Sequence, residues 1–301
     1  MLFRSWCDDL LTGQPPTLYP VGEGELARIE IGPKLVTLFG GSPGSGKTAL
    51  TMQFVVDALR LTPTLRAVVC NIEMPPEVLL DRQLARLSGI DAEAIRYRRL
   101  AGEHSARLDA GLATLETVAD RLCFVRPPFT LENVAASCDA FGGALLVLDY
   151  IQRIPPPGQH GDRRGAVDAT MNYLRQFADA GAAVVVVAAV ARQKDAKGRS
   201  SYGGDSLTLA SFRESSELEF GADDAFILAP SDKADGIVEL RHLKARHTEP
   251  RDVRLRFDRR RQSFAVDNSA PPKPDGKLQS ALASLWHRTA PASDDAEGGE
   301  R

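Results

Sequence analysis

The stretch GGSPGSGKTAL, residues 40–50, decides how the rest of this 301-residue chain is interpreted. It satisfies the pattern G-x-x-x-x-G-K-[ST], whose glycines allow backbone N–H groups to turn toward phosphate oxygens. The run LVTLFG before it (35–40) is typical of a short strand, and TALTMQFVVDALRL after it (48–61) has helical apolar spacing. The motif requires a position between a strand and a helix, so the stretch predicts a phosphate-binding loop rather than a chance glycine-rich turn.

The loop is expected to bind the phosphates of ATP, helped by the positive N-terminus of the following helix. Lys47 is expected to bridge the β- and γ-phosphates, and Thr48 to ligate Mg²⁺. Many unrelated proteins carry such a loop, so it predicts the cofactors ATP and Mg²⁺ and leaves the activity open. The residues expected to contact the nucleotide are Gly41, Ser42, Pro43, Gly44, Ser45, Gly46, Lys47, Thr48 and Ala49.

Two acids follow strands that we expect to end near the loop. Asp149 closes the apolar run LLVLD, and Glu73 closes CNIE. In an open α/β sheet, ligands bind beyond the carboxyl ends of the strands, so Asp149 is expected to hold Mg²⁺ if its strand neighbours the first. The alternative is an acid that caps the next turn. Glu73 is a candidate to polarise water in line with the γ-phosphate, although a surface glutamate after a strand is common.

The chain alternates strands and helices. RAVVCNIEM (66–74), ALLVLDY (144–150) and GAAVVVVAAVA (181–191) are predicted strands, and Pro76 is placed to begin the helix after the first of them. Runs that are apolar on both faces indicate a parallel sheet covered by helices, so we predict an α/β, doubly wound domain. After about residue 225, AFILAP, GIVELRHL, DVRLRFD and QSFAV indicate an antiparallel extension of that sheet.

Composition is that of an ordinary globular protein, with 26% charged and 43% hydrophobic residues. The net charge of −3 excludes a global basic field that would recruit nucleic acid, so such binding needs a local basic surface. Four widely separated cysteines suggest neither a zinc site nor a disulfide framework. No apolar run has the length of a membrane span, and acids interrupt the start of the chain. We expect a cytoplasmic protein with no membrane partner.

Three segments are predicted. Residues 1–24 form an N-terminal arm, residues 25–267 the ATPase domain, and residues 268–301 a mostly disordered tail with one short helix, KLQSALASLWHR. In the arm, Leu2, Phe3, Trp6 and Leu10 fall on one helical face, which either docks on a neighbouring subunit or packs on its own domain.

Four further motifs resemble one family in the right order, from about residue 25 to 266. NIEMPPEVLLDRQLARLSGI (71–90), LLVLDYIQRI (145–154), SFRESSELEFGADDAFIL (211–228) and LKARHTEPRDVRLRFDRRRQSF (243–264) are similar to motifs of the RecA-like motor domain of DnaB-type replicative helicases. The resemblance implies a RecA-like P-loop fold and DNA-dependent ATP hydrolysis. It strengthens Glu73 as the catalytic carboxylate beside Lys47, and it implies that Lys244 and Arg246 reach into the nucleotide site of the next subunit.

A guanidinium supplied from a neighbour can bond two oxygens of the γ-phosphoryl group as charge grows there. Hydrolysis would then depend on assembly. The alternative for Lys244 and Arg246 is a solvated hairpin. The denser basic run Arg259, Arg260 and Arg261 is predicted to be a solvated turn.

Contacts to DNA are expected from two loops that follow strand ends and face the centre of a ring. Flexible loops with cations suit backbone phosphates without base recognition, and the alternative is ordinary mobile loops. The candidates in RIPPPGQHGDRRGA (153–166) and RQKDAKGRSSYGGDS (192–206) are Arg163, Arg164, Lys194, Lys197 and Arg199.

The sequence departs from the family at two places. Ala191 stands where the family usually has a glutamine that senses the γ-phosphate, with Gln193 two residues on. Only about 40 residues precede the loop, so the family's helical N-terminal domain, which organises the ring and meets primase, is not expected here.

Two hypotheses remain open. The first is a DNA helicase or translocase of the DnaB class, which hydrolyses ATP, assembles as a hexameric ring on single-stranded DNA and has a primase or loader as a further partner. The second is a nucleotide-switched module in which ATP sets assembly or partner choice without strand separation. A small-molecule kinase is disfavoured, because Lys244 and Arg246, the finger residues expected to enter a neighbour's site, and the appended strands have no role there.

Overall fold

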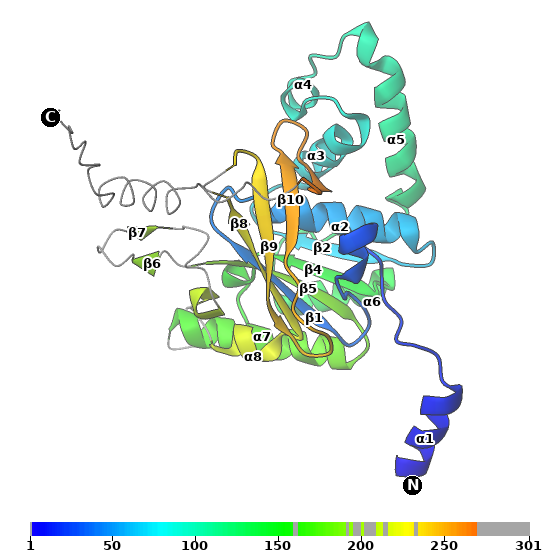
Figure 1. The fold of residues 1–301 in the computed structure, drawn as a ribbon, viewed down its shortest axis with the longest axis vertical. Coiled ribbons are helices and arrows are strands. Elements are labelled where there is room, and N and C mark those ends of the chain that lie inside the picture. Colours follow the sequence, from blue (N-terminus) through cyan, green and yellow to red (C-terminus); the bar gives the residue numbers. More distant parts are fainter. Residues whose placement is uncertain are drawn as a thin grey trace, which may run out of the picture. The chain divides into compact units, whose positions relative to one another are not determined.

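The computed structural model of the protein describes residues 2–158, 162–190, 193–194, 200–201, 209–212, 216–231 and 234–269. Within these residues the central element is a nine-stranded sheet of order β11-β10-β9-β8-β1-β5-β4-β2-β3 (Figure 1). The strands are β1 (Val36–Gly41), β2 (Ala67–Asn71), β3 (Leu122–Phe124), β4 (Leu145–Asp149), β5 (Ala183–Ala189), β8 (Asp224–Pro230), β9 (Ile237–Ala245), β10 (Val253–Asp258) and β11 (Ser263–Val266). A separate short pair joins β6 (Gln193–Lys194) to β7 (Ser200–Ser201).

The predicted α/β fold is confirmed, with one correction. The strands from β8 to β3 are parallel, and β9, β10 and β11 are antiparallel. The prediction assigned AFILAP to the antiparallel extension, and this was wrong: β8 runs parallel to β1, with Thr37 paired to Asp224 and Gly41 to Leu228. The helix α8 (Ser216–Gly221) precedes β8 and returns the chain to the edge where the parallel strands begin, which a hairpin does not do.

Helices cover both faces of the sheet (Figure 1). α2 packs on one face together with residues of α3 and α5, and α6, α7 and α8 pack on the other. β1, β2 and β4 are buried along their whole length because each is covered from both sides. The helices are α1 (Leu2–Thr12), α2 (Lys47–Leu61), α3 (Pro76–Ser88), α4 (Ala92–Arg96), α5 (Ser105–Ala119), α6 (Leu131–Phe141), α7 (Arg163–Asp179) and α8 (Ser216–Gly221), with 3₁₀ turns η1 (Gly24–Arg28), η2 (Gly102–His104), η3 (Ile151–Arg153) and η5 (Leu209–Phe212).

The register of the parallel strands brings the ends of four strands to one edge. Asn71, the last residue of β2, pairs with Asp149, the last residue of β4. Gly41, the last residue of β1, pairs with Ala189 at the end of β5, the strand between β1 and β4. The helices after β1 and β2 start close by: α2 begins directly after Gly46, and α3 begins at Pro76, as its sequence predicts. This edge therefore collects the side chains that the sequence nominated.

The antiparallel hairpin of β10 and β11 is joined to α2 by a buried amide. Gln53 Nε2 donates to the carbonyl of Phe264 at 2.9 Å, and the Phe264 N–H donates to Gln53 Oε1 at 2.9 Å. The rings of Phe257 and Phe264 stack, with centroids 4.2 Å apart. The hairpin is thus fixed to α2, the helix that follows the phosphate loop.

The chain divides into Met1–Asp267 and Asn268–Arg301. The predicted arm contains α1, on which Phe3, Trp6 and Leu10 are exposed. The predicted tail helix lies outside the described residues. Among the residues that the structure describes, no helix has the length and hydropathy needed to cross a membrane.

Candidate nucleotide site

The loop after β1 is shaped by glycines whose conformation and packing exclude a side chain. Gly46 has φ of 94°, and a Cβ at this position would lie 2.7 Å from Cζ of Phe264. A Cβ on Gly41 would lie 2.6 Å from Oγ of Ser45. The hydroxyl of Ser45 is buried and has no hydrogen-bond partner within the described structure. A buried polar group without a partner is costly, and a phosphate oxygen supplies the acceptor that this hydroxyl lacks.

Lys47 lies over the same loop. Its Nζ donates to the carbonyl of Gly41 at 2.8 Å and to that of Ser42 at 3.0 Å. Burial lowers the pKa of Lys47, while the charges of Asp149 and Glu73 act in the opposite direction. The ammonium is therefore held in a poorly solvated place beside two carboxylates, where an anionic phosphate favours its charged form.

Thr48 and Asp149, the predicted magnesium ligands, are in direct contact. Thr48 Oγ1 donates to Oδ2 of Asp149 at 2.6 Å, and Asn71 Nδ2 donates to the same oxygen at 2.8 Å. Asp149 is 3% exposed. Burial raises its pKa, Glu73 adds to this effect, and the contacts with Thr48, Lys47 and Asn71 oppose it. A hydroxyl and a buried carboxylate are the oxygen ligands that Mg²⁺ takes beside a phosphate, so the donor set fits the ion.

Glu73 lies at the rim of the same site. The side chain of Asn71 turns the chain here, because its Oδ1 accepts from the N–H groups of Glu73 and Met74 at 3.0 and 2.8 Å. Asn71 thus holds Asp149 with its amide nitrogen and shapes the Glu73 turn with its amide oxygen. The sequence did not identify this residue, although its position at a strand end next to Glu73 is a usable signal.

A cavity of about 900 Å³ lies over this edge, and its lining includes Gly46, Lys47, Thr48, Glu73 and Asp149. Three arginines that the sequence did not place in the site also line it: Arg82 of α3, Arg153 of η3 and Arg259 of the β10–β11 turn. Burial and the nearby Arg96 charge lower the pKa of Arg82, and Asp149 acts against them.

Arg259 lies in an exposed turn, as predicted, but this turn borders the nucleotide cavity, which the sequence did not predict. Its Nη1 donates to the carbonyl of Gly44 at 3.3 Å, and Phe257 and Gln262 of the same hairpin line the cavity beside it. The sequence could not show this position, because only the tertiary fold brings the hairpin to the loop. Arg260 and Arg261 pair instead with Asp91 and Asp258.

Lys244 and Arg246 lie at the other edge of the sheet. Ala245 pairs with Asp224, which pairs with Thr37 near the start of β1, whereas the loop follows the end of β1. Four residues of strand span about 13 Å. Lys244 Nζ donates to the carbonyl of Ala222 at 2.7 Å, and Arg246 forms an ion pair with Asp223 at 2.7 Å.

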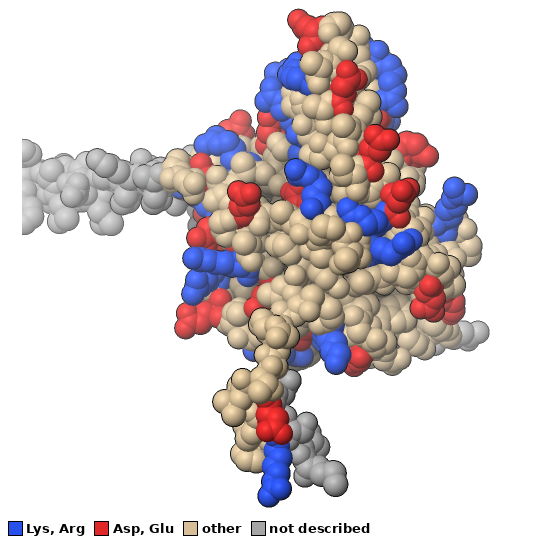
Figure 2. Space-filling model, turned by 90° about the vertical axis from the view of Figure 1, so that its right-hand side faces the viewer, with Lys and Arg blue, Asp and Glu red and all other residues tan. Residues whose placement is uncertain are grey.

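The predicted DNA contacts are described only in part. Arg163 begins α7, Arg164 is exposed, and Lys194 lies in β6. Lys197 and Arg199 lie outside the described residues, as does Ala191. On the face shown in Figure 2, Lys and Arg side chains alternate with Asp and Glu rather than forming an area of one sign.

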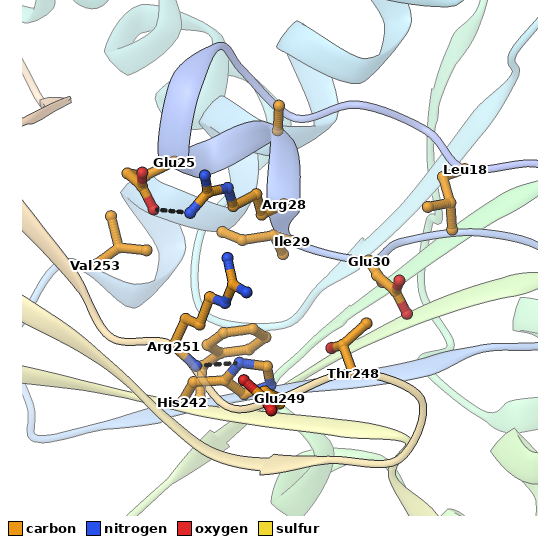
Figure 3. Close-up of a pocket in the computed structure, with 12 residues that line it drawn as sticks. Leu18, Glu25, Arg28, Ile29, Glu30, His242, Thr248, Glu249, Arg251 and Val253 are labelled. Carbon is orange, nitrogen blue, oxygen red and sulfur yellow. Dashed lines mark hydrogen bonds and ion pairs between the residues drawn. The ribbon is translucent and has the colours of Figure 1, made fainter.

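A second hollow of about 330 Å³ lies between the η1 segment and the turn from β9 to β10 (Figure 3). His242 forms part of its wall and stacks on Phe226, with centroids 4.1 Å apart. Both ring nitrogens have partners: Nε2 lies 2.9 Å from Asp224 Oδ1, and Nδ1 accepts from the Arg251 N–H at 3.2 Å. His242 therefore holds the strand and the turn in place, and neither nitrogen is available for acid–base chemistry.

Comparison with known proteins assigns the family. The model of the DnaB-like helicase C terminal domain matches residues 31–266. The chain belongs to this family. The fold is also that of two solved structures, each at a TM-score of 0.74 and 19% identity. One is described as the ATPase domain of G40P, with 89% of this chain and 97% of that chain covered. The other is a DnaB-like replicative helicase studied with its interactions with primase, with 87% of this chain and 65% of that chain covered.

Replacement of Gly46 by Ala tests whether the hairpin restrains the loop of this DnaB-like domain. The added Cβ would meet the Phe264 ring and impose a strained φ, so we expect at least a tenfold loss of ATP affinity by calorimetry and a lower melting temperature. Gly24→Ala is the matched control: φ is 59° and nothing lies within 4 Å, so it adds only the backbone cost of about 1 kcal/mol. Unchanged affinity in Gly46→Ala would show that the hairpin does not restrain the loop.

Proposed function

We propose that the protein hydrolyses ATP as a ring-forming motor on single-stranded DNA. The observation that carries this proposal is the placement of two half-sites at opposite edges of one sheet. The loop, Thr48, Asp149 and Glu73 gather where the parallel strands end, and Lys244 and Arg246 lie where β1 and β8 begin. A cation at the second edge does not reach the first edge of its own chain, so it acts only on another copy.

The chemistry follows from charge and position. The loop N–H groups and Lys47 would hold the phosphates, and Thr48 with Asp149 would hold Mg²⁺, whose charge would offset the negative charge on the phosphate oxygens. Glu73 is exposed at the rim, and its carboxylate is a hydrogen-bond acceptor by its chemistry, so it would orient and polarise a water for attack on the γ-phosphorus. Arg82 and Arg153 add positive charge on the same chain.

A neighbouring copy completes the site. Its Arg246 places a guanidinium against the equatorial γ-phosphate oxygens, with Lys244 beside it. Each chain carries the phosphate loop at one edge and Arg246 at the other, so successive copies associate head to tail, and such an interface gives a ring when the rotation between copies closes. A hexamer is the closed form we propose.

Single-stranded DNA is the proposed track. Arg163, Arg164, Lys194, Lys197 and Arg199 follow strand ends and supply cations for backbone phosphates. The solved relative studied with primase supports a primase or a loader as a further partner.

The second candidate is a nucleotide-switched assembly module. Ala191 favours it, because a side chain without polar atoms replaces the family's usual γ-phosphate sensor. In this case ATP still controls the contact between copies, and no strand separation follows.

Glu73→Gln tests the hydrolytic step. The amide keeps the shape of the carboxylate and loses its ability to accept a proton, so turnover should fall at least 100-fold while ATP affinity stays within about twofold. Steady-state phosphate release and calorimetry measure the two quantities. Glu77→Gln, on the exposed first turn of α3, is the control and should leave both unchanged. Near-normal turnover in Glu73→Gln would remove this residue from the mechanism.

Arg246→Ala tests the finger. We expect turnover to fall about 100-fold or more, with ATP binding by the separate chain unaltered, because Arg246 does not line its own cavity. Arg256→Ala, an exposed arginine on the neighbouring strand β10, is the control. If Arg246→Ala turns over ATP like the wild type, completion of the site in trans is wrong.

Mass and turnover measured on the same samples separate motor from switch. The motor predicts that ATP produces a larger assembly and that single-stranded DNA raises turnover at least several-fold, with unwinding of a forked duplex. ATP-dependent assembly without stimulation or unwinding would support the switch. A protein that remains a single chain and hydrolyses ATP at full rate would contradict both.

A further inference from the structure

The finger is held by a buried carboxylate that joins three parts of the fold. Asp223, between α8 and β8, has a side chain that is 3% exposed. Its Oδ2 accepts from the Val36 N–H of β1 at 2.8 Å and from Arg175 Nη1 of α7 at 2.6 Å. Its Oδ1 contacts Arg246 Nη1 at 2.7 Å.

Arg246 is held at a second point as well. Its Nη2 donates to the carbonyl of Phe220 at the end of α8, at 3.1 Å. Its backbone N–H also donates to the carbonyl of Asp223 at 3.0 Å. A guanidinium has five N–H donors in a rigid plane, so two contacts fix its orientation and leave other donors for a ligand. The side chain is 44% exposed, so a second molecule can reach those donors.

Strand β9, which leads to Arg246, contains a bulge just before that residue. The pairing of β8 with β9 shifts between Ala225 and Phe226, and Leu243 is the extra residue. A bulge of this kind redirects the side chains that follow it. Before the bulge, the pair of His242 and Asp224 fixes the strand, as described above for the second hollow. The segment from Leu243 to Arg246 therefore follows a fixed residue, His242, and the Arg246 side chain is paired with Asp223.

We propose that Asp223 is a positioning residue for the proposed reaction, which orients Arg246 for the nucleotide site of the adjacent copy. The inference rests on the proposed function, because it requires Arg246 to act in trans. The same carboxylate is bonded to the start of β1, whose other end carries the phosphate loop. Strand β1 thus connects Asp223, which holds Arg246 for the adjacent copy, to the phosphate loop of the same chain.

The test is turnover of Asp223→Asn alone and in mixed assemblies. The amide cannot pair with two arginines, so the Arg246 orientation is lost and kcat should fall about 10- to 100-fold, with the KM for ATP unchanged. Asp179→Asn is the matched control, since it removes another carboxylate partner of Arg175 and leaves Arg246 untouched. Circular dichroism and melting confirm that each variant is folded; if Asp223→Asn is not, Asp223→Glu, which keeps the charge and moves it, replaces it.

Mixing separates a positioning role from a merely structural one. A Glu73→Gln chain has an inactive site and an intact finger, so its addition should restore turnover to Asp223→Asn chains, as it should to Arg246→Ala chains. In addition, Asp223→Asn should cause no further loss of turnover in the Arg246→Ala background.

Three results would overturn the proposal. Rescue of Arg246→Ala without rescue of Asp223→Asn would mean that Asp223 supports the site of its own chain, and the proposed function would stand. Turnover of Asp223→Asn at or above the wild-type rate would mean that the carboxylate does not position the finger. Wild-type turnover in Arg246→Ala itself would overturn the proposed function, and this inference with it.

Discussion

The parallel alignment of β1 between β5 and β8 is the constraint on which the rest of the structure depends. Both neighbours are paired to β1 along its length, and both faces are covered by helices. In this environment the backbone polar groups have no solvent to bond, so each must find its ladder partner and the register is fixed. A fixed register places the phosphate loop at one end of β1 and Asp223 at the other.

Two buried carboxylates at these ends show how charge is accommodated in the fold. Asp149 has polar neighbours in Thr48 and Asn71, but burial still raises its pKa because the charged form is poorly solvated, and a divalent cation would stabilise that charged form. Asp223 has two arginines and a backbone N–H. Removing an arginine would leave this buried carboxylate without one of its charged partners, which is destabilising. The first carboxylate is therefore prepared for a ligand, and the second is satisfied within the protein.

The antiparallel hairpin adds what the parallel sheet lacks. It carries Phe257 and Phe264 against Gly46, where no Cβ fits, and it brings Arg259 to the loop carbonyl at Gly44. Gln53 fixes the same hairpin to α2. The loop is thus enclosed by strands more than 200 residues away in the sequence, and its shape depends on the whole domain.

The sequence by itself determined the fold class, the phosphate loop and the two acids that follow strands, because glycine spacing, apolar runs and strand-end acids are local patterns with a local physical cause. Lys244 and Arg246 were predicted from the resemblance to the family's motifs. Tertiary structure alone decided that β8 is parallel to β1, that Arg82, Arg153 and Arg259 line the cavity, and that Asp223 holds Arg246. These facts depend on which segments pack together, and packing between distant segments leaves no periodic signal in either segment alone.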